Sequence, residues 1–249
     1  LVKALQRESF FETKVCVTAQ HREMLDQVLD FFEIKPEYDL NLMRPGQNLY
    51  QLTADVIMGL KTVLEEFKPD FVMVHGDTTT SSAAALASFY ANTKICHIEA
   101  GLRTFNKHSP FPEEMNRQLT GRLADFHFAP TESAKINLLK EGVNPEFIFV
   151  TGNTVIDALL YAKDKVEEVE DEQIEYLKSI VDYSKDLILV TGHRRENFGN
   201  GFINICNAIK RIALEQNVQI IYPVHLNPNV QKPVNEILFG VKNLILFFS

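Results

Sequence analysis

One stretch, residues 71–85, constrains the fold more strongly than any other part of the sequence. Its first four residues, Phe-Val-Met-Val, are a short apolar run typical of a buried strand. His75, Gly76 and Asp77 follow, and then Thr-Thr-Thr and the small-residue run Ser-Ser-Ala-Ala-Ala, which predict the start of a helix. In an open parallel sheet, ligands bind at the carboxyl ends of the strands, where such helices begin. We therefore expect Asp77 to lie in a ligand-binding crevice.

The rest of the chain repeats this alternation of strand and helix. Apolar runs predict further strands at residues 14–19, 94–99, 125–130, 147–150, 187–190, 219–225 and 244–248. Helical spacing of apolar residues, with Pro, Gly and acidic residues near the ends, predicts helices that begin near residues 20, 48, 81, 112, 132, 200 and 230. Strands that alternate with helices predict an α/β fold, with parallel sheets covered on both faces.

The alternation is interrupted by a stretch that suits a connector between two domains. Residues 155–183 are helical in spacing and rich in acidic side chains, a composition typical of a solvated segment. We expect domains at residues 1–165 and 166–249. The three strands after the connector are fewer than the roughly five or six of a doubly wound sheet. We therefore expect an incomplete second domain, and a first domain without its opening strand.

Composition excludes several classes of function. The 249 residues are 45% hydrophobic and 23% charged, as in an ordinary globular protein. The net charge of −8, with no basic run longer than Arg194-Arg195, argues against a nucleic-acid surface. No apolar run reaches the roughly 18 residues of a membrane span, and we find no signal-peptide pattern. The three cysteines are widely spaced, which predicts reduced core thiols of a cytoplasmic protein rather than a disulfide or metal site.

Two carboxylates follow predicted strands directly. For Asp77 the alternative role is that of a helix N-cap, because Asp satisfies the free N–H groups of a first turn. Glu99 follows a buried run and precedes Ala100 and Gly101, and its alternative role is that of a surface acid. The two together are a stronger signal than either alone, because neighbouring buried carboxylates push their pKa values apart and permit one acid and one base.

Two further clusters carry candidate chemistry. Glu113 and Arg117 are four residues apart in a predicted helix, either as part of a site or as a surface ion pair of a few tenths of a kcal/mol. His193 and Arg194 lie in a glycine-containing loop between a strand and a helix, an arrangement suited to phosphate binding. The histidines without a partner at ligand spacing are expected to be structural: His21, His75 and His97.

Seven segments in order carry a resemblance to a known family. They are Val-Thr-Ala-Gln-His-Arg at 17–22, His-Gly-Asp-Thr-Thr-Thr at 75–80, Ile-Glu-Ala-Gly-Leu-Arg-Thr at 98–104, Pro-Glu-Glu-Met-Asn-Arg at 112–117, Thr-Gly-Asn-Thr at 151–154, Thr-Gly-His-Arg-Arg-Glu at 191–196 and Tyr-Pro-Val-His-Leu-Asn-Pro at 222–228. Over nearly its whole length the chain resembles the bacterial non-hydrolysing UDP-N-acetylglucosamine 2-epimerases.

The resemblance implies a fold and a reaction. The fold is similar to that of GT-B glycosyltransferases, with two Rossmann-like domains and the nucleotide sugar in the cleft between them. The implied reaction interconverts UDP-N-acetylglucosamine and UDP-N-acetylmannosamine for surface polysaccharide precursors. It proceeds by elimination and re-addition of UDP, with neither NAD nor a metal. The implied partners are the nucleotide sugar, UDP and a second copy of the chain in a homodimer.

The resemblance also implies roles for individual residues. Asp77, Glu99 and Glu113 match the catalytic carboxylates, and His193 matches a catalytic histidine that faces the UDP moiety. The substrate-binding positions are Arg117, Arg194, Gln20 and Gln47. In family members regulated by their substrate, a second UDP-N-acetylglucosamine is held at positions that resemble Gln20, Gln47, Glu113, His193 and Arg194. Glu23 and Gly46 depart from that pattern.

Some segments of the family pattern lie outside these 249 residues: an initial Gly-Thr-Arg-Pro-Glu loop, and later Ser-Gly-Gly and Glu-Glu-Ala-Pro segments. We therefore expect the chain on its own to be inactive and poorly folded, with an unpaired sheet edge. Two alternatives to the reversible epimerase remain at this point. One is a hydrolysing relative that releases N-acetylmannosamine and UDP, and the other is an inactive fragment of the epimerase.

Overall fold

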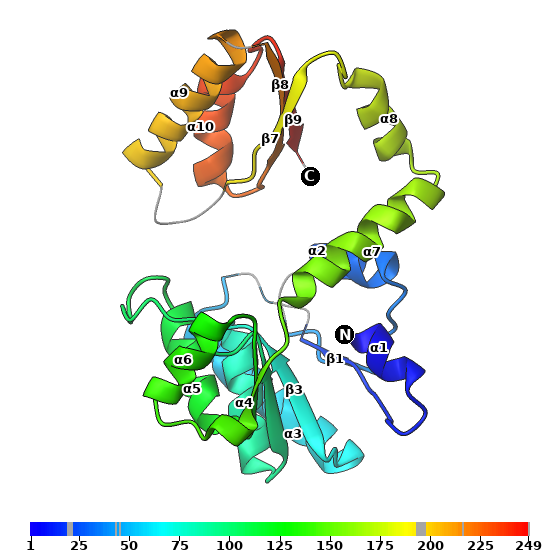
Figure 1. Ribbon diagram of the computed structural model, residues 1–249, viewed down its shortest axis with the longest axis vertical. Helices are drawn as coiled ribbons and strands as arrows, with labels where there is room; N and C mark the ends of the chain where they lie inside the picture. Colours follow the sequence, from blue (N-terminus) through cyan, green and yellow to red (C-terminus); the bar gives the residue numbers. More distant parts are fainter. Residues whose placement is uncertain (19–21, 43, 45, 193–197, 216, 249) are drawn as a thin grey trace. The chain divides into compact units, whose positions relative to one another are not determined.

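A computed structural model describes the chain from residue 1 to residue 248, apart from residues 19–21, 43, 45, 193–197 and 216. The chain divides into two compact units, Leu1–Asp164 and Lys165–Ser249. Each unit contains a parallel sheet with helices beside it (Figure 1), so the predicted α/β class is confirmed.

The main sheet of the first unit has four parallel strands in the order β3-β4-β5-β6. Its strands are β3 (Phe71–His75), β4 (Lys94–Ile98), β5 (Phe126–Ala129) and β6 (Ile148–Val150). The connecting helices are α4 (Thr79–Tyr90), α5 (Glu113–Leu123) and α6 (Glu132–Lys140). In the register, His75 pairs with Ile98, so β3 and β4 end side by side.

The remaining elements of this unit include a small second sheet, in which β1 and β2 pair in parallel. They are α1 (Val2–Arg7), β1 (Cys16–Val17), α2 (Arg22–Phe31), β2 (Tyr38–Asp39), α3 (Leu49–Phe67), the 3-10 helix η1 (Pro145–Phe147) and α7 (Thr154–Glu168), which runs on into the second unit. The sequence did not predict β2 or η1. Each is only two or three residues long and lacks an apolar run.

Helix α3 shows how the sequence fixes a helix. Asn48 accepts a hydrogen bond from the Gln51 N–H, and the Gln51 side chain accepts one from the Asn48 N–H, which completes a capping box. Apolar residues then recur every four positions and are buried against α4: Leu52, Val56, Leu60 and Leu64.

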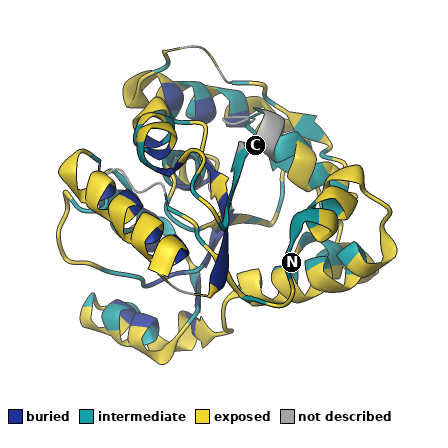
Figure 2. Cartoon of the chain, turned by 90° about the horizontal axis from the view of Figure 1, so that it is seen from above, coloured by how far each residue is buried: buried dark blue, intermediate teal, exposed yellow. Residues whose placement is uncertain are grey.

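Helices α4, α5 and α6 pack on one face of the main sheet. Val74 and Ile95 pack there against Ala85 of α4, and Ala129 and Ile148 pack against α6. The buried residues of the sheet and of the inner helix faces are dark blue in Figure 2. On the opposite face Phe71, Met73 and Phe149 are 39–48% exposed, so the expectation of helices over both faces is met on only one.

The second unit has three parallel strands in the order β7-β8-β9. Its elements are α8 (Glu172–Ile180), β7 (Asp186–Leu189), α9 (Asn200–Glu215), β8 (Val218–Val224), α10 (Pro228–Leu238) and β9 (Leu244–Phe248). The two largest fully buried side chains, Phe202 and Tyr222, lie in its core. The Tyr222 hydroxyl donates to the Gly192 carbonyl at 3.0 Å, which ties β8 to the loop that follows β7.

Two other expectations bear on the fold. All three cysteines are free thiols, and Cys96 and Cys206 are buried, as predicted for core positions. Among the described residues, no helix is both long and apolar enough to cross a membrane.

Candidate active site

The candidate site lies at the carboxyl ends of β3 and β4, where the chain turns into α4. Gly76 makes the turn with φ of +69°, a conformation that glycine adopts readily. The cap of α4 is Thr78, whose Oγ1 accepts a hydrogen bond from the Ser81 N–H at 3.1 Å. The alternative role of Asp77 as helix cap is therefore wrong, and its carboxylate is available for other contacts.

Asp77 pairs with a guanidinium from α5. Arg117 Nη2 lies 2.9 Å from Asp77 Oδ2, and both side chains are largely buried, at 11% and 29% exposure. Burial raises the pKa of Asp77; Arg117 lowers it, and the negative charges of Glu113 and Glu99 raise it again. The net effect is a pKa above the ordinary value, which favours proton transfer nearer to neutral pH.

Glu99 occupies the neighbouring strand end in a strained conformation. Its φ is +66°, in the left-handed region that residues with a Cβ rarely adopt. Strain of this kind clusters at functional sites. Its Oε2 lies 3.5 Å from His75 Nε2, and a Cβ atom at Gly76 would be 3.4 Å from the same oxygen. The Gly76 N–H also donates to the Ile98 carbonyl at 2.9 Å, so the two turns are joined.

Glu113 begins α5 and is partly buried. The alternative of a surface ion pair between Glu113 and Arg117 is wrong, because Arg117 pairs with Asp77 and with Glu114, three residues before it. Residues three and four apart both lie on one helix face, so spacing alone could not choose between them. The charge of Glu113 still contributes to the raised pKa of Asp77, so Asp77, Glu99 and Glu113 form one electrostatic group.

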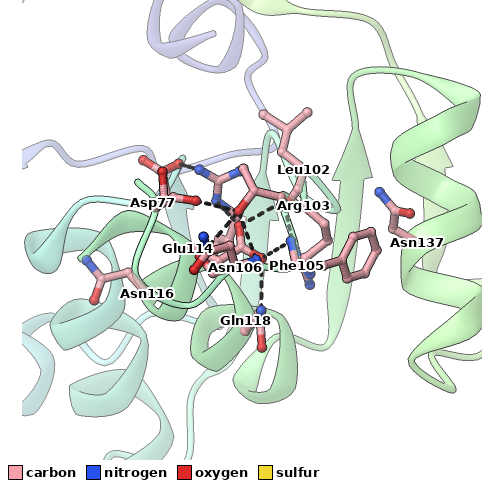
Figure 3. Close-up of polar contacts among 12 residues, drawn as sticks. Asp77, Leu102, Arg103, Phe105, Asn106, Glu114, Asn116, Gln118 and Asn137 are labelled. Atoms are coloured by element: carbon pink, nitrogen blue, oxygen red, sulfur yellow. Dashed lines mark hydrogen bonds and ion pairs between the residues drawn. The ribbon is translucent and has the colours of Figure 1, made fainter. Parts of the chain in front are cut away.

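Glu114 is a residue of this region that the sequence analysis did not single out. Its carboxylate accepts hydrogen bonds from the Thr104 N–H, the Phe105 N–H and Gln118 Nε2, at 3.0, 3.1 and 2.9 Å (Figure 3). Burial raises the pKa of Glu114, but these hydrogen bonds outweigh it and the pKa is below the ordinary value. The two adjacent acidic residues of the Pro-Glu-Glu motif were the sequence feature that could have pointed to Glu114.

The loop after β4 is also held by contacts with α6 and its C-cap. Arg103, whose side chain has no exposed surface, holds Glu141 through two contacts, Nε to Oε1 at 2.6 Å and Nη2 to Oε2 at 2.7 Å. Asn137 Nδ2 donates to the Gly101 carbonyl at 3.0 Å. Both partners come from α6 or its C-cap, so α6 and α5 together fix the path of the loop between Glu99 and Glu113.

His97 supports the Asp77 turn from inside the sheet. Its Nε2 lies 2.8 Å from the Gly76 carbonyl, and its Nδ1 is buried without a hydrogen bond. Burial lowers the pKa of His97 to about 4, so the ring is neutral and donates through Nε2. The expectation of a structural histidine is confirmed for His97. His75 instead lies mostly exposed beside Glu99.

Of the other expected site residues, the structure describes Gln47, whose hydrogen bond goes to a helix outside this cluster. Gln47 Nε2 donates to Asp55 Oδ2 at 3.0 Å, near the start of α3. Gln20, His193 and Arg194 lie outside the described residues. Among the residues that are described, no group of three His, Cys, Asp or Glu side chains could hold a metal ion.

Comparison with known proteins decides the family. A family profile described as UDP-N-acetylglucosamine 2-epimerase matches residues 3–249. The chain belongs to this epimerase family. Curated UDP-N-acetylglucosamine 2-epimerases of Yersinia pestis and Escherichia coli K12 are each 58% identical to it over 249 residues. The alignment covers 99% of this chain and 66% of each relative, so the chain spans about two thirds of their length.

Solved structures of UDP-N-acetylglucosamine 2-epimerases agree with this assignment. The crystal structure of the Neisseria meningitidis enzyme, bound to UDP-GlcNAc, is 48% identical and matches with a TM-score of 0.92 over 100% of this chain and 67% of that one. The Methanocaldococcus jannaschii enzyme, in complex with UDP-GlcNAc and UDP, is 32% identical with a TM-score of 0.79, over 99% and 68%. The predicted resemblance to this epimerase family is therefore confirmed.

Proposed function

We propose that the protein that carries this chain interconverts UDP-N-acetylglucosamine and UDP-N-acetylmannosamine by inverting C2 of the sugar. The observation that supports it most is that Asp77, paired with Arg117, and Glu99 follow adjacent strands, and that the charges of Glu99 and Glu113 both act on Asp77. Membership of the epimerase family, whose solved members include complexes with UDP-GlcNAc and UDP, supports the same substrate class.

The proposed reaction has two halves. In the first, a carboxylate takes the proton from C2 while the bond between C1 and the UDP oxygen breaks, which leaves 2-acetamidoglucal and UDP. In the second, a proton is delivered to the opposite face of C2 and the UDP oxygen re-attacks C1. No net oxidation occurs, so the scheme needs a base, an acid and cations for the departing diphosphate, and no redox cofactor.

The side chains are suited to these demands. A carboxyl group with a raised pKa exchanges a proton closer to neutral pH than an ordinary carboxyl does, and the pKa of Asp77 is raised. We assign the transfer of protons at C2 to Asp77, Glu99 and Glu113 as a group, because coupled carboxylates titrate together. We assign a catalytic role facing the UDP moiety to His193, and binding of the nucleotide sugar to Arg117, Arg194, Gln20 and Gln47.

Exchange of the C2 proton with solvent tests the proposal. We expect UDP-N-acetylglucosamine in D2O to lose its C2 proton signal in the 1H NMR spectrum while UDP-N-acetylmannosamine forms. D77N and E99Q should each slow the exchange by about 100-fold or more, because a positioned acid or base contributes roughly 10²–10⁴-fold. E132Q, which changes an exposed acid in the first turn of α6, is the matched control and should leave the rate unchanged.

Two results would contradict the assignment. Retention of the C2 proton by a folded protein under these conditions would exclude epimerisation through proton abstraction. Accumulation of free N-acetylmannosamine would instead identify a hydrolysing enzyme. We further propose that the product supplies surface polysaccharide synthesis, and that the enzyme acts in the cytoplasm as a homodimer, for which sedimentation velocity provides a direct test.

A further inference from the structure

Glu114 is the one acidic residue that is fully buried in the described part of the chain. A buried carboxylate is costly unless hydrogen bonds and an opposite charge surround it. The proposed reaction assigns no step to Glu114, although it directly follows Glu113 in α5. The partners that keep its charge in the interior therefore indicate what it does.

The partners of Glu114 lie on two sides of the carboxylate. The Thr104 and Phe105 N–H groups bond to it from the loop between Glu99 and Glu113. Gln118 Nε2 and the guanidinium of Arg117 approach from its own helix, with Arg117 Nε 3.6 Å from Glu114 Oε2. Figure 3 shows Glu114 close to Phe105, Gln118 and Asp77. Glu114 thus links that loop to Arg117.

Arg117 lies between two carboxylates. One end of its guanidinium, Nη2, contacts Asp77 at 2.9 Å, and the other side, Nε, faces Glu114. Nε is buried and makes no hydrogen bond, so the charge of Glu114 is what compensates it. A guanidinium has a fixed planar geometry. Its orientation toward Asp77 therefore depends on what holds the Nε side.

We propose that Glu114 is a positioning residue that holds Arg117 against Asp77 from the buried side and does not itself touch the substrate. Any effect of Glu114 on catalysis rests on the proposed epimerase function. The position of Arg117 relative to Asp77 can be measured without turnover.

Titration of Asp77 reports the position of Arg117, because a cation within a few ångströms favours the ionised carboxylate. The other charged groups that face Asp77 are Glu113 from α5 and Glu99 at the end of β4, which in turn contacts His75 of β3. Removal of the Glu114 charge frees the Nε side of Arg117, and the guanidinium then spends less time at Asp77. The titration of Asp77 is therefore expected to move to higher pH.

The experiment follows the 13Cγ resonance of Asp77 against pH in the protein that carries this chain, labelled with [4-13C]aspartate, with D77N to assign the signal. E114Q should move the Asp77 midpoint to higher pH. E114D keeps a carboxylate but withdraws it from Arg117, and should move the midpoint in the same direction by less. If E114Q fails to fold, E114D carries the test.

E141Q is the matched control, because it weakens the clamp on the same loop from the α6 side without touching Arg117. It should leave the Asp77 midpoint unchanged. The proposal would be overturned if the titration midpoint of Asp77 were the same in E114D or E114Q as in the parent. It would also be overturned if the midpoint moved equally in E141Q. Glu114 would then be a purely structural acid.

A double-substitution cycle with R117K tests whether Glu114 affects Asp77 through Arg117. If Glu114 acts through Arg117, E114Q should cause no further shift of Asp77 in the R117K background. A shift of the same size in both backgrounds would contradict the proposal. In the epimerase assay, E114Q should lower kcat about 10-fold or more with little change in KM, because small misplacements of catalytic groups are costly. Absence of turnover in the protein that carries this chain would refute the proposed function alone, since the titration still decides the positioning.

Discussion

Arg117 Nη2 lies 2.9 Å from Asp77 Oδ2, yet the pKa of Asp77 is raised, not lowered. Burial and the charges of Glu99 and Glu113 together outweigh the guanidinium. Ionised Asp77 is therefore held in the folded state at a cost in stability. A carboxylate that opposes folding at neutral pH and lies among other acids is typical of a functional site.

Replacement of Asp77 by Asn should separate activity from stability. The folded state binds the Asp77 proton more tightly than the unfolded state does, so ionised Asp77 opposes folding above its folded pKa, and this penalty disappears at pH values below the unfolded pKa. We expect D77N at pH 7 to show a urea midpoint equal to or higher than that of the parent. A clearly lower midpoint for D77N would mean that the ion pair with Arg117 is net stabilising.

The order of strands and helices followed from the sequence, because apolar runs bounded by Pro, Gly and acidic residues mark each element. The two-residue strand β2 (Tyr38–Asp39) was missed, because it forms only through its pairing with Cys16 and Val17. Local sequence cannot encode a strand that short.

The candidate site was predictable where residues follow strands directly, as Asp77 and Glu99 do. It was not predictable where a contact depends on how distant segments fold together. Arg103 and Glu141 are 38 residues apart, and Glu114 is buried only because the irregular loop places the Thr104 and Phe105 N–H groups over it. Whether Arg117 forms an ion pair with Asp77 or with an acid of its own helix also depends on where the tertiary fold places Asp77.

His97 should make the fold sensitive to mild acid. Burial lowers its pKa from the ordinary value of 6.5 to about 4, so the unfolded chain binds a proton more readily and stability falls as the pH drops from about 7 toward 4. The loss from His97 at pH 5 is about 2 kcal/mol by linkage. H97Q keeps a donor for the Gly76 carbonyl and removes the titration, so its unfolding free energy should change less between pH 7.5 and pH 5. If the unfolding free energy of H97Q fell as much as that of the parent between pH 7.5 and pH 5, His97 would not be the cause of the acid sensitivity.

Two glycines with similar backbone angles should respond differently to alanine. Gly101 has φ of +89°, and a Cβ atom there would lie 2.3 Å from the Ala134 carbonyl oxygen, whereas Gly142 has φ of +82° and nothing within 4 Å. G142A reports backbone strain alone, about 1–2 kcal/mol. G101A adds a clash with the α6 backbone and should lower the unfolding free energy by clearly more. Equal losses in urea denaturation would mean that α6 moves freely away from Gly101.

The Arg103–Glu141 pair should matter far more than a surface pair of the same length. Arg103 is fully buried, so E141A leaves a cation in the interior without its partner and should lower the unfolding free energy by about 3 kcal/mol. The Lys178–Glu175 pair, also at 2.7 Å, is exposed, and E175A is the control that should leave stability unchanged. R103K should fail to replace arginine, because an ammonium cannot make both contacts at once. If E141A and E175A unfold at the same urea concentration as the parent, water reaches Arg103 and the clamp on the loop after β4 is weak.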